Sequence, residues 1–385
     1  MNKELERKLI EIRQLLHKNP ELGFCEFETS KLIRNHMDKL KISYETLALT
    51  GTLATLRKGE GPTVILRADM DALPIAEDTG LRFTSSKLDI MHACGHDIHT
   101  TMLIGAAYQL KDIEFAGTIK FLFQPSEEGN LRSPQVGKSG GQIIAESGVI
   151  EGAKTVIGLH VDPSMDVGTI GFKGGEALAN VCNFIITVKG KSGHAGALEH
   201  VTDPVLISSQ LIVSAQSIIS HTAPARPAVL AFTSTEILGV PAYNIVPETV
   251  ILKGSLRVLN LEIYNIIIKK LKLLMAGMEV SYDCQINMEL TAYYPSLLND
   301  PKIHQLLVPV HEAVFGKGVL PQEGQLIAED FAFYSRKVPS VFYFLGARAK
   351  NRETYYLHHP KVEFNEDCIA FGVQFFCEAA LKILK

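Results

Sequence analysis

Short apolar segments that alternate with helical segments constrain the fold of this chain more than any other feature. Residues 63–68, 117–124 and 154–159 are predicted to be strands, and residues 100–111 and 140–147 between them are predicted to be helices. The run Val64-Ile65-Leu66 is apolar throughout, which is typical of a strand covered on both faces. The alternation predicts an α/β fold with a largely parallel sheet and helices on both faces.

The pattern changes near residue 180, and a chain of 385 residues is long enough for two domains. Beyond that point the order of predicted elements is βαββαβ, the ferredoxin-like arrangement, with strands at 181–189, 229–237, 249–259 and 280–290 and helices at 203–220 and 262–275. After residue 295 the first pattern resumes, with a helix at 301–315, a strand at 340–345 and a last helix at 366–384. We therefore expect an inserted domain at 180–292 and a discontinuous domain formed by 1–179 and 293–385.

Polar side chains follow three predicted strands of the discontinuous domain. Asp69 and Asp71 follow the first strand, Glu127 and Glu128 follow the second, and His160 follows the third. In open α/β sheets, binding sites form at the edge where the carboxyl ends of the strands meet. The sequence therefore predicts that these side chains belong to one site.

The stretch MHACGHDIHT at residues 91–100 holds one thiol, three imidazoles and one carboxylate. A single glycine separates Cys94 from His96, so the backbone can turn tightly and direct both side chains to one point. Thiolate and imidazole together suit zinc or a neighbouring divalent metal. A single histidine in a loop would not indicate a metal site, but this density of potential ligands favours one. The candidate ligands along the chain are Asp69, Asp71, Cys94, His96, Glu127, Glu128, His160 and either His358 or His359.

These candidates exceed the four ligands of one ion, so two metals fit the pattern. Two adjacent ions can hold a bridging water molecule and lower its pKa. The pair Glu127-Glu128 then suggests that one carboxylate binds metal while the other accepts a proton from water. An isolated Glu-Glu pair is usually a solvated surface turn, but this pair directly follows a buried strand. His194 lies between glycines at 193 and 196, and on these residues alone it is predicted to be an exposed histidine in a hairpin turn.

Composition excludes several classes of function. The net charge of −4 provides no basic footprint for nucleic acid, and no apolar run reaches the ~18 residues that span a membrane. The N-terminus is charged and lacks the apolar core of a signal peptide. Six cysteines are scattered singly, which argues against a disulfide framework and for a reducing compartment. We expect a cytoplasmic protein.

Six motifs resemble those of the aminoacylase-type metallopeptidase and amidohydrolase family. They occur in the family's order and are RADMDALP (67–74), MHACGHD (91–97), QPSEEG (124–129), GLHV (158–161), GHA (193–195) and LHHP (357–360). The resemblance covers nearly the whole chain. It points to the branch that holds hippurate hydrolase, N-acetyldiaminopimelate deacetylase and the plant auxin-conjugate (IAA-amino acid) hydrolases.

The resemblance implies a role for each motif residue. Two divalent metal ions are expected, zinc or manganese first and cobalt or nickel as alternatives, with Cys94, His96, Glu128, His160 and His358 as ligands. Glu127 would be the general base, and Asp71 would orient His96. From the inserted domain, His194 would stabilise the oxyanion, reaching across a dimer interface if two chains pair, and Asn244 and Arg257 would hold the substrate carboxylate. His92, Asp97 and His99 are left as packing or supporting residues.

The activity expected from the resemblance is cleavage of the amide bond of an N-acyl amino acid, with a dipeptidase or carboxypeptidase as the alternative within the family. A non-catalytic metal-binding protein on the same fold is the alternative of another class. The inserted domain would serve as a lid and as the contact of a homodimer or higher homo-oligomer. The sequence departs from the family pattern in two places that concern the substrate contacts. They are an apparent insertion at 130–138 and the absence of a proline soon after His194.

Overall fold

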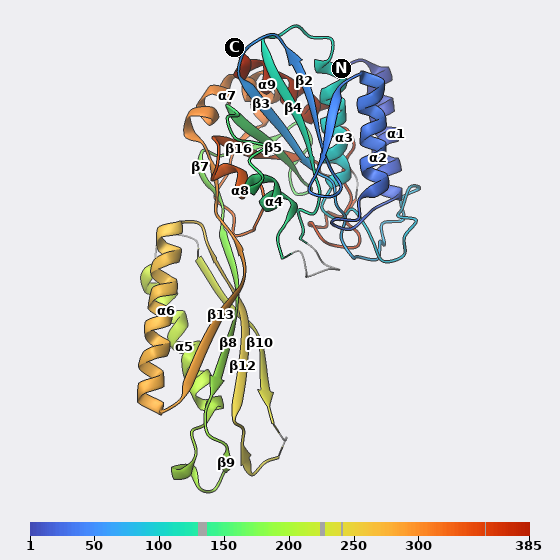
Figure 1. The fold of residues 1–385 in the computed structure, drawn as a ribbon. Helices are drawn as coiled ribbons and strands as arrows, with labels where there is room; N and C mark the ends of the chain where they lie inside the picture. Colours follow the sequence, from blue (N-terminus) through green and yellow to red (C-terminus); the bar gives the residue numbers. More distant parts are fainter. Residues whose placement is uncertain (130–136, 224–227, 240–241, 351) are drawn as a thin grey trace. The chain divides into compact units, whose positions relative to one another are not determined.

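The computed structural model describes residues 1–129, 137–223, 228–239, 242–350 and 352–385, and it divides into two compact units (Figure 1). Unit 1 comprises Met1–Gly175, Leu298–Glu323 and Asp330–Lys385, and unit 2 comprises Glu176–Leu297 and Gly324–Glu329. The predicted boundaries assigned the segment Gly324–Glu329 to the discontinuous domain. It belongs to unit 2 because Gln325 pairs with Leu178 and donates its N–H to the carbonyl of Ala177 at 2.9 Å. Residues 130–136 of the predicted insertion lie outside the described residues.

Unit 1 is built on an eight-stranded sheet in the order β1-β2-β4-β3-β5-β16-β6-β15. Its strands are β1 (Ser43–Leu47), β2 (Gly51–Lys58), β3 (Thr63–Asp69), β4 (Gly117–Gln124), β5 (Thr155–Asp162), β6 (Ile170–Phe172), β15 (Val319–Pro321) and β16 (Ser340–Gly346). The four central strands β4, β3, β5 and β16 are mutually parallel, as predicted. Both edges contain antiparallel pairs, β1 with β2, β2 with β4, and β6 with β16, so the sheet is mixed.

Helices cover both faces of this sheet. The helices of unit 1 are α1 (Lys3–Lys18), α2 (Phe27–Leu40), α3 (His96–Leu110), α4 (Gly140–Glu146), α7 (Pro301–Phe315), α8 (Ala332–Ser335) and α9 (Cys368–Leu384). Leu66 on β3 packs into one core with apolar residues of α1, α2, α3 and α9. Successive side chains of a strand point to opposite faces, so Arg67 points the other way. There it contacts Asp330, just before α8, which also accepts the N–H of Gly141 in α4 at 2.7 Å.

Strand pairing moves two boundaries that bear on the site. The third strand was predicted to end before His160, but β5 continues through His160 to Asp162 because β16 pairs with it from Val156 to Asp162. The segment 91–100 was expected as a loop followed by a helix at residue 100, whereas α3 begins at His96. His160 and His96 are therefore held by regular secondary structure.

Unit 2 contains a four-stranded antiparallel sheet in the order β10-β12-β8-β13. Its main elements in chain order are β8 (Asn180–Lys189), α5 (Pro204–Thr222), β10 (Ala228–Leu238), β12 (Thr249–Val258), α6 (Leu261–Tyr282) and β13 (Gln285–Tyr294). This order and connectivity are those of the ferredoxin-like arrangement. Helix α6 runs past the predicted end at 275 because Met275 and Met278 continue its buried face, so the strand predicted from 280 begins at Gln285.

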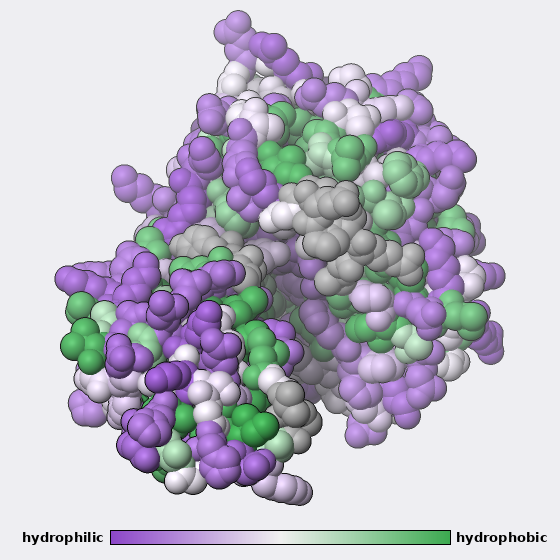
Figure 2. Space-filling model, turned by 60° about the horizontal axis from the view of Figure 1, so that its bottom comes forward, coloured by the Kyte–Doolittle hydropathy of each residue, from purple (hydrophilic) through white to green (hydrophobic). Residues whose placement is uncertain are grey.

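Short elements complete the chain. They are β7 (Gly175–Leu178), β9 (Gly193–His194), β11 (Ile245–Val246), β14 (Leu297–Asn299) and the 3₁₀ turns Leu198–His200 and Gly316–Gly318. The face drawn in Figure 2 is largely hydrophilic, with smaller groups of apolar side chains between the polar ones. Among the described residues, no helix has the length and apolar character needed to span a membrane.

Candidate metal centre

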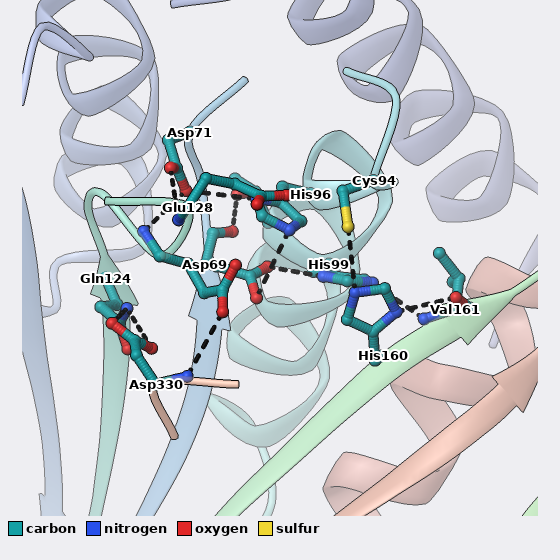
Figure 3. Close-up of polar contacts among 12 residues, drawn as sticks. Asp69, Asp71, Cys94, His96, His99, Gln124, Glu128, His160, Val161 and Asp330 are labelled. Carbon is teal, nitrogen blue, oxygen red and sulfur yellow. Dashed lines mark hydrogen bonds and ion pairs between the residues drawn. The ribbon is translucent and has the colours of Figure 1, made fainter. Parts of the chain in front are cut away.

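Five chain segments of unit 1 bring thiol, imidazole and carboxylate groups together at one edge of the sheet. Figure 3 shows the groups that come from the ends of β3 and β4, from β5 and from the start of α3. Asp69 ends β3 and Asp71 follows it, the turn after β4 provides Glu127 and Glu128, and β5 provides His160. Cys94 and His96 lie on either side of Gly95 at the start of α3, and His358 lies in the loop before α9. Ligand atoms of these residues and of His99, on α3, form overlapping groups, each within 4.8 Å: Cys94, His96 and His160; Cys94, Glu128 and His358; His96, Glu127 and Glu128; and Asp69, His96 and His99.

The backbone at Gly95 explains why a glycine separates Cys94 from His96. Gly95 has φ of +81°, a left-handed conformation that residues with a side chain rarely adopt. A Cβ atom added here would lie 2.3 Å from Cγ2 of Val161 on β5. Glycine therefore lets the start of α3 approach β5, and this approach places Cys94 Sγ 3.3 Å from His160 Nε2.

Hydrogen bonds determine which ring nitrogen of each histidine is available to a metal. His160 Nδ1 lies 2.8 Å from the carbonyl oxygen of Val161, which can only accept, so Nδ1 carries the hydrogen and Nε2 keeps its lone pair. His96 Nδ1 lies 3.2 Å from Asp71 Oδ1, while His96 Nε2 is buried without a hydrogen-bond partner among the described residues. Both histidines thus present Nε2 to the centre of the cluster.

The pair formed by Glu128 and His358 borders this cluster. His358 Nε2 lies 3.0 Å from Glu128 Oε1, and the His358 side chain is half-exposed whereas that of Glu128 is mostly buried. His358 has φ of +66°, which is strained for a residue with a side chain. Burial opposes ionisation of Glu128, but the hydrogen bond from His358 and the charge of His96 hold its pKa below the ordinary value.

One carboxylate, that of Asp71, organises three of these groups. Its Oδ1 accepts the backbone N–H of Glu127 at 3.0 Å and contacts His96 Nδ1, and its Oδ2 accepts the N–H of Glu128 at 3.1 Å. The Glu127 carboxylate is held separately, because its Oε1 accepts the N–H of Asp330 at 3.3 Å. The two adjacent glutamates are therefore fixed relative to His96.

A buried network that the sequence did not predict lies behind these residues. Arg67 contacts Asp69 at 2.7 Å, Asp330 at 2.9 Å and Gln124 at 2.8 Å. His99, which was assigned only to packing or support, accepts the N–H of Val161 through Nε2 at 2.9 Å and donates from Nδ1 to Asp69 at 2.5 Å. Apart from the Arg67–Asp69 pair, these partners are far apart in the chain, so the main sequence signal was the position of Asp69 at a strand end.

The electrostatics of the cluster fit divalent cations. Burial lowers the pKa of His96, but Asp69, Asp71 and Glu128 outweigh it and raise that pKa to about 10. Burial and the carboxylates of Glu128, Glu127 and Asp69 raise the pKa of the Cys94 thiol well above its ordinary value. A thiolate is a good zinc ligand, so a bound cation would favour ionisation of this thiol. The thiol, imidazole and carboxylate donors together match the ligand set of zinc or a neighbouring metal.

The candidate residues of unit 2 fall into two places. His194 is exposed on β9, which pairs with β11, and Ala195 donates its N–H to the Asn244 carbonyl at 2.9 Å. Arg257 lies near the other end of β12, where it donates to the carbonyl of Leu326 at 2.9 Å. Arg257 is eight positions along the strand from Thr249, which corresponds to about 26 Å. One chain therefore brings His194 and Asn244 together but leaves Arg257 at the opposite end of the sheet.

Comparison with known proteins identifies the family of this chain. The sequence profile of peptidase family M20/M25/M40 matches residues 65–382. N-acetyl-L-cysteine deacetylase of Bacillus subtilis (strain 168) is 36% identical over 99% of this chain and 89% of its own length. IAA-amino acid hydrolase ILR1-like 4 of Arabidopsis thaliana is 33% identical over 98% of this chain and 86% of its own length.

A solved structure extends the comparison to the fold. The crystal structure of a Bacillus subtilis protein described as a dinuclear metal-binding peptidase of the M20 family covers 100% of this chain and 99% of its own, with a TM-score of 0.85 and 31% identity. These matches confirm the predicted resemblance to the aminoacylase-type family and its hydrolase branch.

Proposed function

The chain belongs to peptidase family M20/M25/M40 and is therefore a hydrolase of amide bonds, and from this premise we propose that it cleaves N-acyl amino acids into a carboxylate and a free amino acid. One observation carries the proposal, namely the way Glu127 is held beside the metal-ligand cluster. Asp71 accepts its backbone N–H, and the backbone N–H of Asp330 binds its carboxylate. A protein that only bound metal would not need a carboxylate fixed in this way, so the geometry favours catalysis over the metal-binding alternative.

The substrate class is suggested by the named relatives. One is a deacetylase of N-acetyl-L-cysteine and the other a hydrolase of IAA-amino acids, so both names describe an acyl group joined to an amino acid. We extend that class to this chain. The acyl groups to be compared are acetyl, benzoyl and indole-acetyl, which differ in the pocket they require.

The proposed metal ligands are Cys94, His96, Glu128, His160 and His358, which provide donors for two divalent ions. Zinc or manganese is the first choice, and cobalt or nickel would be tested as substitutes. When bound, these ions would act as Lewis acids that polarise the amide carbonyl.

Glu127 would move the proton that the reaction requires. Its carboxylate accepts a proton from the attacking water molecule as the water oxygen bonds to the carbonyl carbon. When the carbon–nitrogen bond of the resulting tetrahedral intermediate breaks, Glu127 gives the same proton to the departing nitrogen. The carboxylate is thereby regenerated, and the products are a carboxylic acid and an amine.

The substrate-side roles predicted for unit 2 require two chains. We retain His194 as the oxyanion donor and Asn244 and Arg257 as contacts of the substrate carboxylate. Because Arg257 is about 26 Å from Thr249, near which the other two residues lie, all three can serve one small substrate only if two chains contribute. This supports the predicted homodimer.

Mixing two inactive variants tests this arrangement. Random reassociation of His194→Ala with Arg257→Ala chains would leave one intact site in each heterodimer and restore about a quarter of wild-type activity. No restoration in a dimer shown by sedimentation to exchange subunits would refute the shared site.

A substrate panel tests the proposed function. Metal-reconstituted enzyme is assayed for release of free amino acid from N-acetyl, N-benzoyl and indole-acetyl amino acids. Dipeptides belong in the panel because the similar crystal structure is described as a peptidase. Turnover of dipeptides alone would replace our proposal with the peptidase alternative.

The adjacent glutamates provide matched variants. We expect Glu127→Gln to lower kcat by about 10²- to 10⁴-fold with normal metal content, whereas Glu128→Gln should lose metal. Turnover by the Glu127 variant at the wild-type rate would mean that the base is another group.

All six cysteines are free, which agrees with the cytoplasmic location that we propose.

A further inference from the structure

A buried glutamate that no sequence motif singled out, Glu26, contacts the turn that carries Glu127. Glu26 immediately precedes α2, yet its side chain does not cap that helix. Its fully buried carboxyl group instead accepts the backbone N–H of Ser126 through Oε1 at 2.8 Å and the hydroxyl of Thr50 through Oε2 at 2.6 Å. The side chain thus links the segment between α1 and α2 to the end of β4.

Three consecutive backbone N–H groups of this turn are held by two carboxyl groups. Ser126 donates to Glu26, while Glu127 and Glu128 both donate to Asp71. Consecutive N–H groups that converge in this way form an anion-binding concavity. Asp71 binds the backbone of Glu127 and Glu128, which have the proposed chemical roles. Glu26 binds the backbone of Ser126, whose conformation sets the direction of both glutamates.

The backbone of Ser126 needs such a restraint. Its φ of +49° lies in the left-handed region, which is unfavourable for a residue with a side chain. Gly23, from the same segment as Glu26, packs directly on it, since a Cβ atom at Gly23 would lie 2.6 Å from Ser126 Oγ. Without the acceptor at Glu26, the Ser126 N–H would lose its partner in a buried site, and the turn would be free to relax.

We propose that Glu26 is a positioning residue of the hydrolytic site, which acts through the Ser126 N–H to fix the turn that directs Glu127 to the attacking water and Glu128 to the metal. This inference rests on the proposed function, because Glu26 itself touches neither the proposed metal ligands nor the place of the substrate. Its effect is on the geometry of the two glutamates that follow Ser126.

The role requires an acceptor oxygen at this place and does not require a charge. Burial, followed by the nearby charge of Asp71, raises the pKa of Glu26 to about 8. The Ser126 N–H needs only an acceptor oxygen, which the Glu26 carboxyl group offers in either protonation state. Glutamine offers the same acceptor and a donor in the same shape, since the Thr50 hydroxyl can rotate to accept.

Three variants of Glu26 separate positioning from general stability. Glu26→Ala removes the acceptor, Glu26→Gln keeps it without charge, and Glu26→Asp keeps the carboxyl group but withdraws it by one methylene. We expect Glu26→Ala and Glu26→Asp to lower kcat about 10- to 100-fold with a smaller change in KM, as is typical when an outer partner of a metal site is lost. Glu26→Gln should remain within about threefold of wild type. If Glu26→Ala does not fold, the comparison of Glu26→Asp with Glu26→Gln still distinguishes a positioning role from a general effect on stability.

Glu21 provides the matched control. It lies in the same segment, is also buried, and its carboxylate accepts backbone N–H groups of Glu28 and Thr29 at the start of α2. Glu21→Ala should lower the Tm by at least as much as Glu26→Ala and leave kcat unchanged. Wild-type kcat in the Glu26→Asp variant, or an equal loss in Glu26→Gln, would overturn the proposal.

A second readout does not depend on the substrate. Zinc affinity of the metal-free full-length protein is measured by competition with a chromophoric chelator, and Glu26→Ala is expected to weaken it about tenfold because Glu128 is displaced. If every N-acyl substrate is inert but Glu26→Ala still weakens zinc binding, the proposed function fails and the positioning role stands. Unchanged zinc affinity in Glu26→Ala would refute the positioning role.

Discussion

Replacing Asp71 by asparagine isolates the contribution of one buried carboxylate to the metal centre. The carboxylate accepts three bonds, from His96 Nδ1 and from the backbone N–H groups of Glu127 and Glu128. Asparagine has nearly the same shape but only one acceptor oxygen. If that oxygen takes the place of Oδ1, which receives two of the bonds, the amide NH₂ faces the N–H of Glu128, and two donors oppose each other.

The magnitude follows from this single lost bond. A buried donor left without its acceptor costs about 1–3 kcal/mol. Since Glu128 is a proposed metal ligand, most of this cost should fall on the metal-bound state, where the geometry of Glu128 matters most. We expect the zinc Kd of the Asp71→Asn variant to rise about 10- to 100-fold, in line with other outer partners of metal ligands.

The assay is chelator competition on metal-free protein, with thermal unfolding measured in parallel. Asp97→Asn is the control, because Asp97 is equally buried but its carboxylate contacts Arg13 and His17. Disrupting that buried ion pair should lower the Tm and leave the zinc Kd within about threefold of wild type. Unchanged zinc affinity in Asp71→Asn, or equal loss in both variants, would refute the reasoning.

Three further predictions concern stability. Gly95→Ala should destabilise the protein by about 2 kcal/mol or more and weaken metal binding, because the added methyl group meets Val161 at a left-handed backbone position; urea unfolding with and without zinc measures both effects. Arg67→Met should cost about 3–5 kcal/mol by leaving two buried carboxylates without their cation, and a urea midpoint equal to wild type would contradict this. Burial lowers the pKa of His311 to about 3. Below about pH 6.5 the unfolded chain therefore binds a proton at His311 that the folded chain does not bind, and the free energy of unfolding falls as the pH falls. Between pH 7 and 5 this amounts to about 2 kcal/mol, which His311→Phe should remove from the pH dependence of unfolding.

Local patterns predicted the parallel centre of the sheet and the grouping of the strand-end side chains. The apolar run before Asp69 and the alternation with helices predicted the parallel centre of the sheet. Because the carboxyl ends of parallel strands meet at one edge, the sequence alone predicts that Asp69, Glu127 and His160 lie together. The structure groups these strand-end residues with Cys94 and His96, and the spacing across Gly95 is explained by one close approach to β5.

Several features that depend on partners distant in the chain were not predicted from local patterns. The pairing of β16 with β5 extended the strand through His160, and the packing of Gly324–Glu329 placed that segment in unit 2. Glu26 lies 100 residues from the Ser126 N–H that it binds. Such a contact leaves no periodic signal in the sequence, since any buried polar group needs a partner but nothing local specifies which one. The sequence predicts which groups would carry the chemistry because those groups lie in local motifs, whereas most of the contacts that hold these groups in place, such as that of Glu26 with Ser126, exist only in the folded chain.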